Sequence, residues 1–248
     1  MTTPSRIALV TGATRGIGLE TVRQLAAQGV HTLLAGRDLG RAEAAAAALK
    51  AEGLPVEAIA LDVTDEASIA AAAKAVQSRH GHLDILVNNA GILRDDPSLK
   101  PSQQTLQAWR DTFDTNLFGL VAVTNAFLPL LSASTSARIV NVSSLLGSIS
   151  EHLNPASFIY DFKIPAYNVS KTAVNAWTVQ LAHELKGTRI KVLGHHPGYV
   201  KTDMNKSGDE QNGELEVADG ARTSVRLALV GDDGPSGGFF YMDEVLPW

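Results

Sequence analysis

The sequence predicts an α/β fold, with a doubly wound parallel sheet of about seven strands and helices on both faces. Short apolar runs alternate with amphipathic stretches almost from end to end. This is the order required by parallel strands joined through helical crossovers. The strand-like runs also carry few charges, as expected where helices cover both faces of a sheet.

The expected elements follow the same alternation along the chain. Strands are predicted at residues 7–10, 31–35, 56–61, 85–87, 138–142 and 190–193, with a last one around 238–242. Helices are predicted at residues 17–28, 39–52, 66–79, 105–131, 166–186 and 217–230. No repeat or linker divides the chain, so residues 1–248 are expected to form one domain. The polar stretch 203–216 is predicted to be a lid over the site, because long irregular segments in a compact domain are often functional.

Composition narrows the class of protein. The chain has 248 residues, 45% of them apolar and 19% charged, which is typical of a globular protein. It has no cysteine, which excludes disulfides, thiolate metal sites and cysteine nucleophiles. The net charge of −5 and the lack of a basic run argue against a nucleic-acid partner. No apolar run is judged long enough for a membrane span, and residues 1–6 lack the apolar core of a signal peptide, so a cytoplasmic location without a membrane partner is expected.

A glycine-rich segment follows the first predicted strand and opens the first helix, reading Thr11-Gly12-Ala13-Thr14-Arg15-Gly16-Ile17-Gly18. In such a turn the first glycine allows the tight bend, the second lets the backbone approach a pyrophosphate, and the third lets helix and strand pack closely. The N-terminus of the helix adds unpaired N–H groups for phosphate oxygens. The glycines alone fit a purely local turn as well, but their place between strand and helix predicts a dinucleotide site in a Rossmann fold.

The end of the second strand indicates which dinucleotide binds. It reads Ala35-Gly36-Arg37, with glycine where an NAD site usually has a carboxylate for the ribose hydroxyls. Arg37 and Arg15 could pair with a 2′-phosphate, which suits guanidinium groups in charge and geometry. The alternative is that both arginines are solvated surface residues. NADP(H) is the predicted cofactor.

Tyr167 and Lys171 lie four residues apart in a predicted helix, so they share one face. A free tyrosine, with a pKa near 10, moves protons poorly at neutral pH. A nearby ammonium and an oxidised nicotinamide would stabilise its phenolate, which predicts Tyr167 as proton donor and acceptor. Ser143 and Ser144 end a predicted strand, where a hydroxyl could reach a substrate carbonyl, although either serine could instead cap a turn. No Gly-x-Ser-x-Gly elbow surrounds them, so a serine hydrolase is a poor fit.

Taken together, these segments resemble the short-chain dehydrogenase/reductase family over nearly the whole chain. The segments similar to family motifs are Thr11–Gly18, Asp62-Val63, Asn88-Asn89-Ala90-Gly91, Asn116, Asn141-Val142-Ser143-Ser144, Tyr167-Asn168-Val169-Ser170-Lys171 and Pro197-Gly198-Tyr199-Val200-Lys201-Thr202. The cofactor-binding residues implied by the resemblance, together with the NADP assignment, are Gly12, Thr14, Arg15, Gly16, Ile17, Gly18, Arg37, Asp62, Val63, Asn89, Ala90, Gly91, Tyr167, Lys171, Pro197, Gly198, Val200 and Thr202.

The resemblance also implies roles for four catalytic residues. Tyr167 would give its proton to the substrate oxygen while hydride passes from nicotinamide to the carbonyl carbon. Ser144 would hold that oxygen, and Lys171 would bind the nicotinamide ribose and lower the pKa of Tyr167. Asn116 would hold a water that links Lys171 to solvent.

The connection from Ser144 to Tyr167 is longer than is usual in the family. The extra residues, about 150–163, resemble in placement an insertion of the carbonyl reductases. An insertion there could cover a helix face that relatives use between subunits, so a monomer and a homo-oligomer both stay open. The insertion's aromatic residues could line the substrate site or pack locally. His195 and His196 have no clustered ligands beside them, so no metal is expected, and both are placed in the wall of the site.

These observations favour NADPH-dependent reduction of a small aldehyde, ketone or quinone to an alcohol. The other enzymes considered are a 3-oxoacyl reductase and a hydroxysteroid-type alcohol dehydrogenase. A non-catalytic NADP-binding redox sensor is the alternative of another class. A sensor would be free to lose the catalytic set, whereas this chain retains all of Asn116, Ser144, Tyr167 and Lys171.

Overall fold

The computed structural model describes residues 6–207 and 209–248, so the first five residues of the predicted domain and Gly208 of the predicted lid lie outside it. The described residues form an eight-stranded sheet in the order β10-β9-β6-β5-β4-β1-β2-β3, and a separate hairpin of β7 and β8. Every pairing in the large sheet is parallel except that of β9 with β10. The predicted α/β fold is therefore confirmed, and the short antiparallel strand β10 is an addition to it.

The observed elements lie close to the predicted ones. The strands are β1 Ile7–Val10, β2 His31–Gly36, β3 Val56–Ala60, β4 Ile85–Asn88, β5 Ala137–Val142, β6 Ile190–His195, β7 Lys206–Ser207, β8 Glu210–Gln211, β9 Phe239–Tyr241 and β10 Glu244–Val245. The α-helices are α1 Gly16–Ala27, α2 Leu39–Ala51, α3 Glu66–His80, α4 Leu106–Phe113, α5 Leu120–Ser132, α6 Ile149–Leu153, α7 Pro165–Glu184 and α8 Val217–Ala228.

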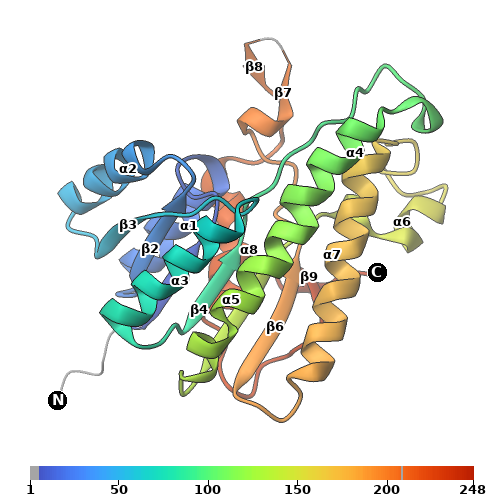
Figure 1. Ribbon diagram of the computed structural model, residues 1–248. Helices are drawn as coiled ribbons and strands as arrows, with labels where there is room; N and C mark the ends of the chain where they lie inside the picture. The colour runs from blue at the N-terminus through green and yellow to red at the C-terminus, as the bar shows by residue number, and fades with distance from the viewer. Residues whose placement is uncertain (1–5, 208) are drawn as a thin grey trace.

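Helices cover both faces of the sheet. In Figure 1, α3, α5 and α7 lie in front of the strands, and α1, α2 and α8 lie behind them. Successive residues of β1 divide between the two layers: Leu9 belongs to the front core with Phe127 of α5, and Val10 to the rear core with Leu25 of α1. This alternation is the period of two that a strand imposes on its side chains.

The predicted helix 105–131 is continuous in path but not in hydrogen-bonding pattern. Between α4 and α5, residues Asp114–Gly119 form a π-helical turn. The whole segment Leu106–Ser132 is long and apolar enough to cross a membrane by length and composition, contrary to the expectation that no segment is. Its apolar residues Val123, Phe127 and Leu131 are fully buried in the front core, which accounts for its composition without a membrane.

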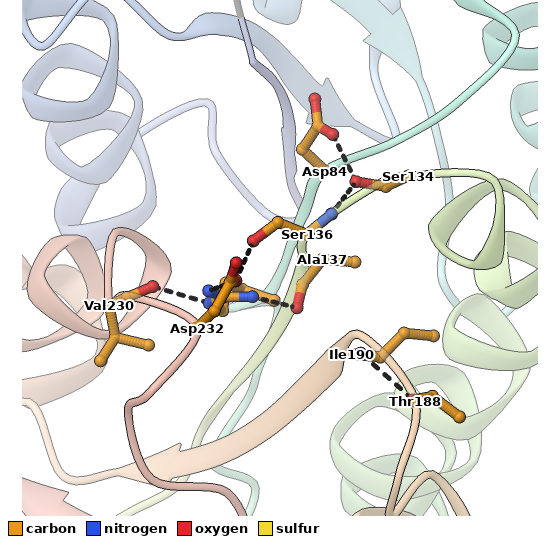
Figure 2. Close-up of polar contacts among 9 residues, drawn as sticks. Asp84, Ser134, Ser136, Ala137, Thr188, Ile190, Val230 and Asp232 are labelled. Atoms are coloured by element: carbon orange, nitrogen blue, oxygen red, sulfur yellow. Dashed lines mark hydrogen bonds and ion pairs between the residues drawn. The ribbon is translucent and has the colours of Figure 1, made fainter.

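The amino ends of the central strands are held by a network of buried polar groups, shown in Figure 2. Arg138 of β5 is 1% exposed and donates to the carbonyl oxygens of Ala137 and Val230 and to Asp232 Oδ1, each over 2.8 Å. Asp84 accepts hydrogen bonds from the Ile7 amide and the Ser134 hydroxyl. These groups satisfy one another within the protein, which is how buried polar groups are usually retained.

Candidate active site

A cleft of about 710 Å³ lies at the carboxyl edge of the sheet. Its walls come from the glycine-rich turn, the end of β2, the loop after β4, the start of α7 and the segment after β6. The strand order reverses at β1, which has β2 on one side and β4 on the other. Open parallel sheets bind their ligands in the crevice at such a reversal.

The glycine-rich turn has little room for side chains. Gly12 and Gly16 have φ of 62° and 57°, in the left-handed region that favours glycine. A Cβ on Gly12 would lie 2.8 Å from Ala90 Cα, and one on Gly18 would lie 2.7 Å from the Gly12 carbonyl oxygen. Helix α1 then begins at Gly16 with its N-terminus toward the cleft, as in a cradle for phosphate groups.

Several arginines gather near the end of β2. Arg15 and Arg37 line the cleft, and so does Arg41, which sequence analysis did not select. Arg41 lies in the first turn of α2, four residues after Arg37, so its closeness in sequence to Arg37 was a usable signal for it. Arg15 is already paired, with 2.6 Å between its Nη1 and Asp203 Oδ2 of the predicted lid. Arg41 is held more loosely, with 3.6 Å between its Nε and Asp38 Oδ2, so Arg37 and Arg41 are the stronger candidates for a 2′-phosphate.

The residues after β3 and β4 form the next part of the cleft wall. Asp62, Val63, Asn89, Ala90 and Gly91 all line it. The Asn89 side chain donates to the carbonyl oxygen of Thr11 over 2.8 Å, and the Thr11 hydroxyl accepts from the amides of Asn89 and Ala90. Asn89 thus holds the glycine-rich turn against the loop after β4.

Tyr167 and Lys171 stand together at the start of α7, as their spacing predicted. Lys171 Nζ lies 5.7 Å from the centre of the Tyr167 ring and donates to the Val142 carbonyl oxygen over 2.8 Å. The Tyr167 hydroxyl is within hydrogen-bonding reach of the Ser144 side chain. Tyrosine and lysine from α7 and serine from the segment after β5 therefore meet at one end of the cleft.

Burial dominates the proton equilibria of this group. It raises the pKa of Tyr167 to about 12, against a smaller lowering effect of the hydrogen bond to Ser144. It lowers the pKa of Lys171 to about 8. The expectation that Lys171 and an oxidised nicotinamide together lower the pKa of Tyr167 concerns the cofactor-bound enzyme and stays a prediction, whereas loss of solvation dominates in the chain by itself. At neutral pH Tyr167 holds its proton, as an acid requires.

The two serines at the end of β5 have different environments. The Ser143 hydroxyl donates to the Lys171 carbonyl oxygen over 3.2 Å and is buried. The Ser144 hydroxyl lies beside Tyr167 and accepts from the Leu146 amide over 3.2 Å. Ser143 therefore ties β5 to α7, and Ser144 is the serine placed near the candidate proton donor.

Asn116 lies in the π-helical turn, close to the same end of the cleft. Its side-chain amide donates to the Ile92 carbonyl oxygen over 2.9 Å and to the Ser170 hydroxyl over 3.0 Å, and its Oδ1 accepts from the Ile92 amide. A Cβ on Gly91 would lie 3.5 Å from Asn116 Oδ1 and 3.6 Å from Lys171 Nζ. Asn116 and Lys171 thus flank Gly91, while the Asn116 side chain is bonded to protein groups.

The segment after β6 closes the cleft from another side. Pro197 and Thr202 line it, whereas Val200 is buried against Gly220 of α8. Gly198 has φ of 91° and turns the chain there. From the predicted lid, Asp203, Met204 and Gln211 also line the cleft. This places the lid segment over the site, partly as the hairpin of β7 and β8 at the top of Figure 1.

His195 ends β6 and His196 follows it. Both lie behind the cleft rather than in its wall, which corrects their predicted position. His195 is fully buried and its Nε2 is 2.7 Å from the Ser224 hydroxyl, while His196 contacts the Tyr241 ring. Burial lowers the pKa of His195 to about 3 and that of His196 to about 4, so both are neutral. The contacts of His195 with α8 and of His196 with β9 could not be inferred from two adjacent residues of the sequence.

The insertion forms α6 and a series of turns outside the cleft. Among the residues that line the cleft, none comes from 150–163. Phe158 is 82% exposed, and His152 bonds through Nε2 to the Leu146 carbonyl oxygen. In this conformation the insertion's aromatic side chains do not reach the site.

Asp95, which the sequence did not indicate, holds the start of the helix that carries Tyr167. Its Oδ1 accepts from the Ala166 amide over 2.8 Å and its Oδ2 from the Tyr167 amide over 2.9 Å. A buried carboxylate on the first amides of a helix satisfies N–H groups that have no partner in the helix. Asp95 and Arg94, which lines the cleft, lie on an irregular loop whose sequence carries no periodic signal.

Comparisons with known proteins agree with this arrangement. The short chain dehydrogenase family matches residues 6–213. "Short-chain dehydrogenase/reductase 1" of Saponaria officinalis is 37% identical, with 98% of this chain and 96% of that protein covered. A (+)-neomenthol dehydrogenase of Capsicum annuum is 33% identical, with 98% of each covered.

Among solved structures, the chain is similar to an NADPH-bound carbonyl reductase from chicken fatty liver. The TM-score is 0.85 at 30% identity, and 99% of this chain and 100% of the other are covered. The similarity spans the sheet, the cleft and the connection before Tyr167 alike. On these matches the chain belongs to the short-chain dehydrogenase family and is an oxidoreductase.

Proposed function

We propose that this protein is an NADPH-dependent carbonyl reductase acting on a small aldehyde, ketone or quinone. The observation that carries the proposal is the buried Tyr167 hydroxyl, protonated at neutral pH, beside Ser144 and Lys171 at the end of a dinucleotide-shaped cleft. The carbonyl reductase and dehydrogenase relatives support the same reaction class.

The residues of the cleft fit a dinucleotide phosphate. The turn has no room for side chains at Gly12 and Gly18 and presents the start of α1, which would hold the pyrophosphate. Gly36 places no carboxylate at the end of β2, and a Cβ there would lie 2.4 Å from Thr14 Cγ2. Arg37 and Arg41 beside it would hold a 2′-phosphate. When bound, NADPH supplies the hydride.

The chain's own residues would then handle the oxygen and its proton. Ser144 and Tyr167 donate hydrogen bonds to the substrate carbonyl oxygen, and Tyr167 delivers its proton as charge develops there. Lys171, held by the Val142 carbonyl oxygen, holds the nicotinamide ribose and favours the phenolate that remains. Asn116 stands across Gly91 from Lys171, where it would keep a water on the path by which Tyr167 regains its proton.

The first test is NADPH oxidation by the purified protein over aldehydes, ketones, quinones and 3-oxoacyl esters. Saturable turnover of the simple carbonyls supports a carbonyl reductase. A strong preference for 3-oxoacyl esters or for steroid alcohols would move the assignment to the corresponding relatives. Tight NADPH binding with no turnover across the panel would contradict the proposal and favour a redox sensor.

The cofactor is tested through Arg37 and Arg41. Because their positive charge is proposed to attract a 2′-phosphate, Arg37→Ala should raise KM for NADPH by about tenfold and leave that for NADH almost unchanged, with a further increase in the double variant. Arg23→Ala, which removes an exposed arginine outside the cleft, is the matched control. Equal effects on both cofactors would contradict the assignment of NADP(H).

A further inference from the structure

A second cluster of potential ligands lies at the amino edge of the sheet. His31 begins β2, Glu57 lies near the start of β3 and His80 ends α3. Strand alternation puts His31 on the same face as Leu33, and Glu57 on the same face as Ile59, which is the face that α3 covers. Figure 1 shows α3 alongside this part of the sheet. Three sequence-distant residues thus converge where β2, the edge strand β3 and the end of α3 meet.

The distances within the cluster suit ligands of one metal ion. Glu57 Oε2 lies 3.5 Å from His31 Nε2 and 3.6 Å from His80 Nε2, and the three ligand atoms are all within 4.8 Å of one another. A charge-assisted hydrogen bond would be shorter, about 2.7–2.9 Å. Zinc–ligand bonds of about 2.0–2.2 Å in a tetrahedron instead place neighbouring ligand atoms roughly 3.3–3.6 Å apart.

The burial of the cluster points the same way. His80 Nε2 is buried and has no hydrogen-bond partner among the described residues. The three side chains are between 16% and 32% exposed, which leaves a path for an ion and room for a water ligand.

The charged neighbours of the cluster are consistent with this role for Glu57. Arg79 binds Glu57 Oε1 and thereby leaves Oε2 directed at the histidines. Metal-binding carboxylates are often oriented by such hydrogen-bond partners. Arg79 and Lys50 also add positive charge near the histidines, which opposes a cation. This positive charge disfavours a hard cation that is held by charge alone. It leaves the advantage to an ion that imidazole binds strongly.

We propose that His31, Glu57 and His80 form a binding site for a divalent transition-metal ion, with zinc as the natural probe and water completing the tetrahedron. Two imidazoles, one carboxylate and an open position are a ligand set that zinc accepts. The site lies at the opposite edge of the sheet from the cleft, since Gly36 at the other end of β2 faces the cleft. It would clamp α3 to the edge strands and take no part in hydride transfer.

The test is calorimetric titration of Zn²⁺ into the full-length protein, freed of metal by chelation and carrying no histidine tag. One zinc is expected to bind per chain, and Co²⁺ in its place should give the visible absorption of a tetrahedral site. His80→Gln and Glu57→Gln should each weaken binding by at least roughly tenfold, since even outer-shell changes can have such effects. Circular dichroism establishes that each variant is folded.

His183→Gln is the matched control, because His183 is an exposed histidine of α7, outside the cluster. It should leave the zinc affinity unchanged. Zinc should also raise the Tm of the wild type and not that of His80→Gln. Absence of stoichiometric binding, or binding equal in the wild type and both cluster variants, would overturn the site. Neither result bears on NADPH oxidation, which should be the same with and without chelator.

Discussion

The two edges of the sheet hold polar groups in different ways. At the amino edge, Arg138 and Asp84 are buried and bonded to protein partners. At the carboxyl edge, Tyr167 and Lys171 are just as buried, but their functional atoms border a cleft large enough for a dinucleotide. The fold thus keeps its structural polar groups at one edge and its reactive groups at the other.

This difference teaches that burial alone does not identify a catalytic group. Arg138 is less exposed than Lys171, yet its partners are two carbonyl oxygens and an aspartate of its own chain. Lys171 has one protein acceptor for a group with three N–H bonds. The unfilled hydrogen-bonding capacity is what distinguishes Lys171 from Arg138, and variants of the residues around each should therefore fail in different assays.

The largest expected effect is at the carboxyl edge. Tyr167→Phe removes the proton donor and leaves the ring that packs beside Lys171. We expect kcat for carbonyl reduction to fall by about 10³-fold, within the usual range for loss of a general acid, with NADPH affinity and Tm nearly unchanged. Stopped-flow turnover and fluorescence titration measure the two quantities. Retention of a tenth or more of the activity would refute Tyr167 as the acid.

The second effect is at the amino edge and should appear only in stability. Arg138→Met keeps much of the side-chain volume but leaves the carbonyl oxygens of Ala137 and Val230 without their donor. We expect the free energy of unfolding to fall by about 2–3 kcal/mol, measured by urea denaturation, with KM unchanged in the folded fraction. Arg222→Met removes an exposed pair with Asp219 and should change stability by less than about 0.5 kcal/mol. Equal losses in the two variants would contradict the structural role of Arg138.

The sequence predicted the arrangement of strands and helices because both depend on periodic patterns. The strands carry short, mostly apolar runs, and the helices that flank them repeat every three to four residues. The π-helical turn at Asn116 and the antiparallel strand β10 carry no such pattern. Both depend on contacts made across the folded molecule, which no local window contains.

The candidate site was predictable to the extent that its residues follow strand ends or share a helix face. Tyr167 and Lys171 were found by helical spacing, and Gly12 by its place after β1. Asp95 and the cluster around His80 were not found, because their partners come from distant segments. The raised pKa of Tyr167 in the cofactor-free chain could not be predicted, since a sequence gives the neighbouring charge but not the loss of solvation.

A third effect separates Lys171 from the groups of the amino edge by its pH dependence. Burial lowers its pKa to about 8 from 10.5, so between these values the unfolded chain holds a proton that the folded chain has released. The free energy of unfolding of the cofactor-free protein should then rise by about 2 kcal/mol from pH 7 to 9.5 through this group.

Lys171→Met removes the titrating group and provides the comparison. Each protein is measured by urea denaturation. From pH 7 to 9.5, the free energy of unfolding of the wild type should rise by about 2 kcal/mol relative to that of the variant. A pH-independent difference would mean that Lys171 titrates alike in the folded and unfolded chain. Burial raises the pKa of Tyr167 to about 12, so Tyr167 lowers the free energy of unfolding as pH rises, but mainly above pH 10. Its effect between pH 7 and 9.5 is small.

The smallest effect should come from Asp95, which joins the structural and reactive roles in one residue. Asp95→Asn keeps one acceptor and turns an amide toward the other N–H, so one of the bonds to Ala166 and Tyr167 is lost. We expect a loss of about 1 kcal/mol in stability, the usual size for a helix cap, and a several-fold fall in kcat with KM unchanged, because the start of α7 carries the proton donor.

Thr105→Ala removes a comparable cap, the hydroxyl that accepts from the Ala108 amide at the start of α4, away from Tyr167. It should cost similar stability and leave kcat as it is. If both variants lower kcat alike, the effect follows from general loosening of the fold. If only Asp95→Asn does so, the carboxylate sets the position of Tyr167. The reactive residues of the carboxyl edge then depend on a buried anion that, like Asp84 at the amino edge, is bonded to groups of the protein itself.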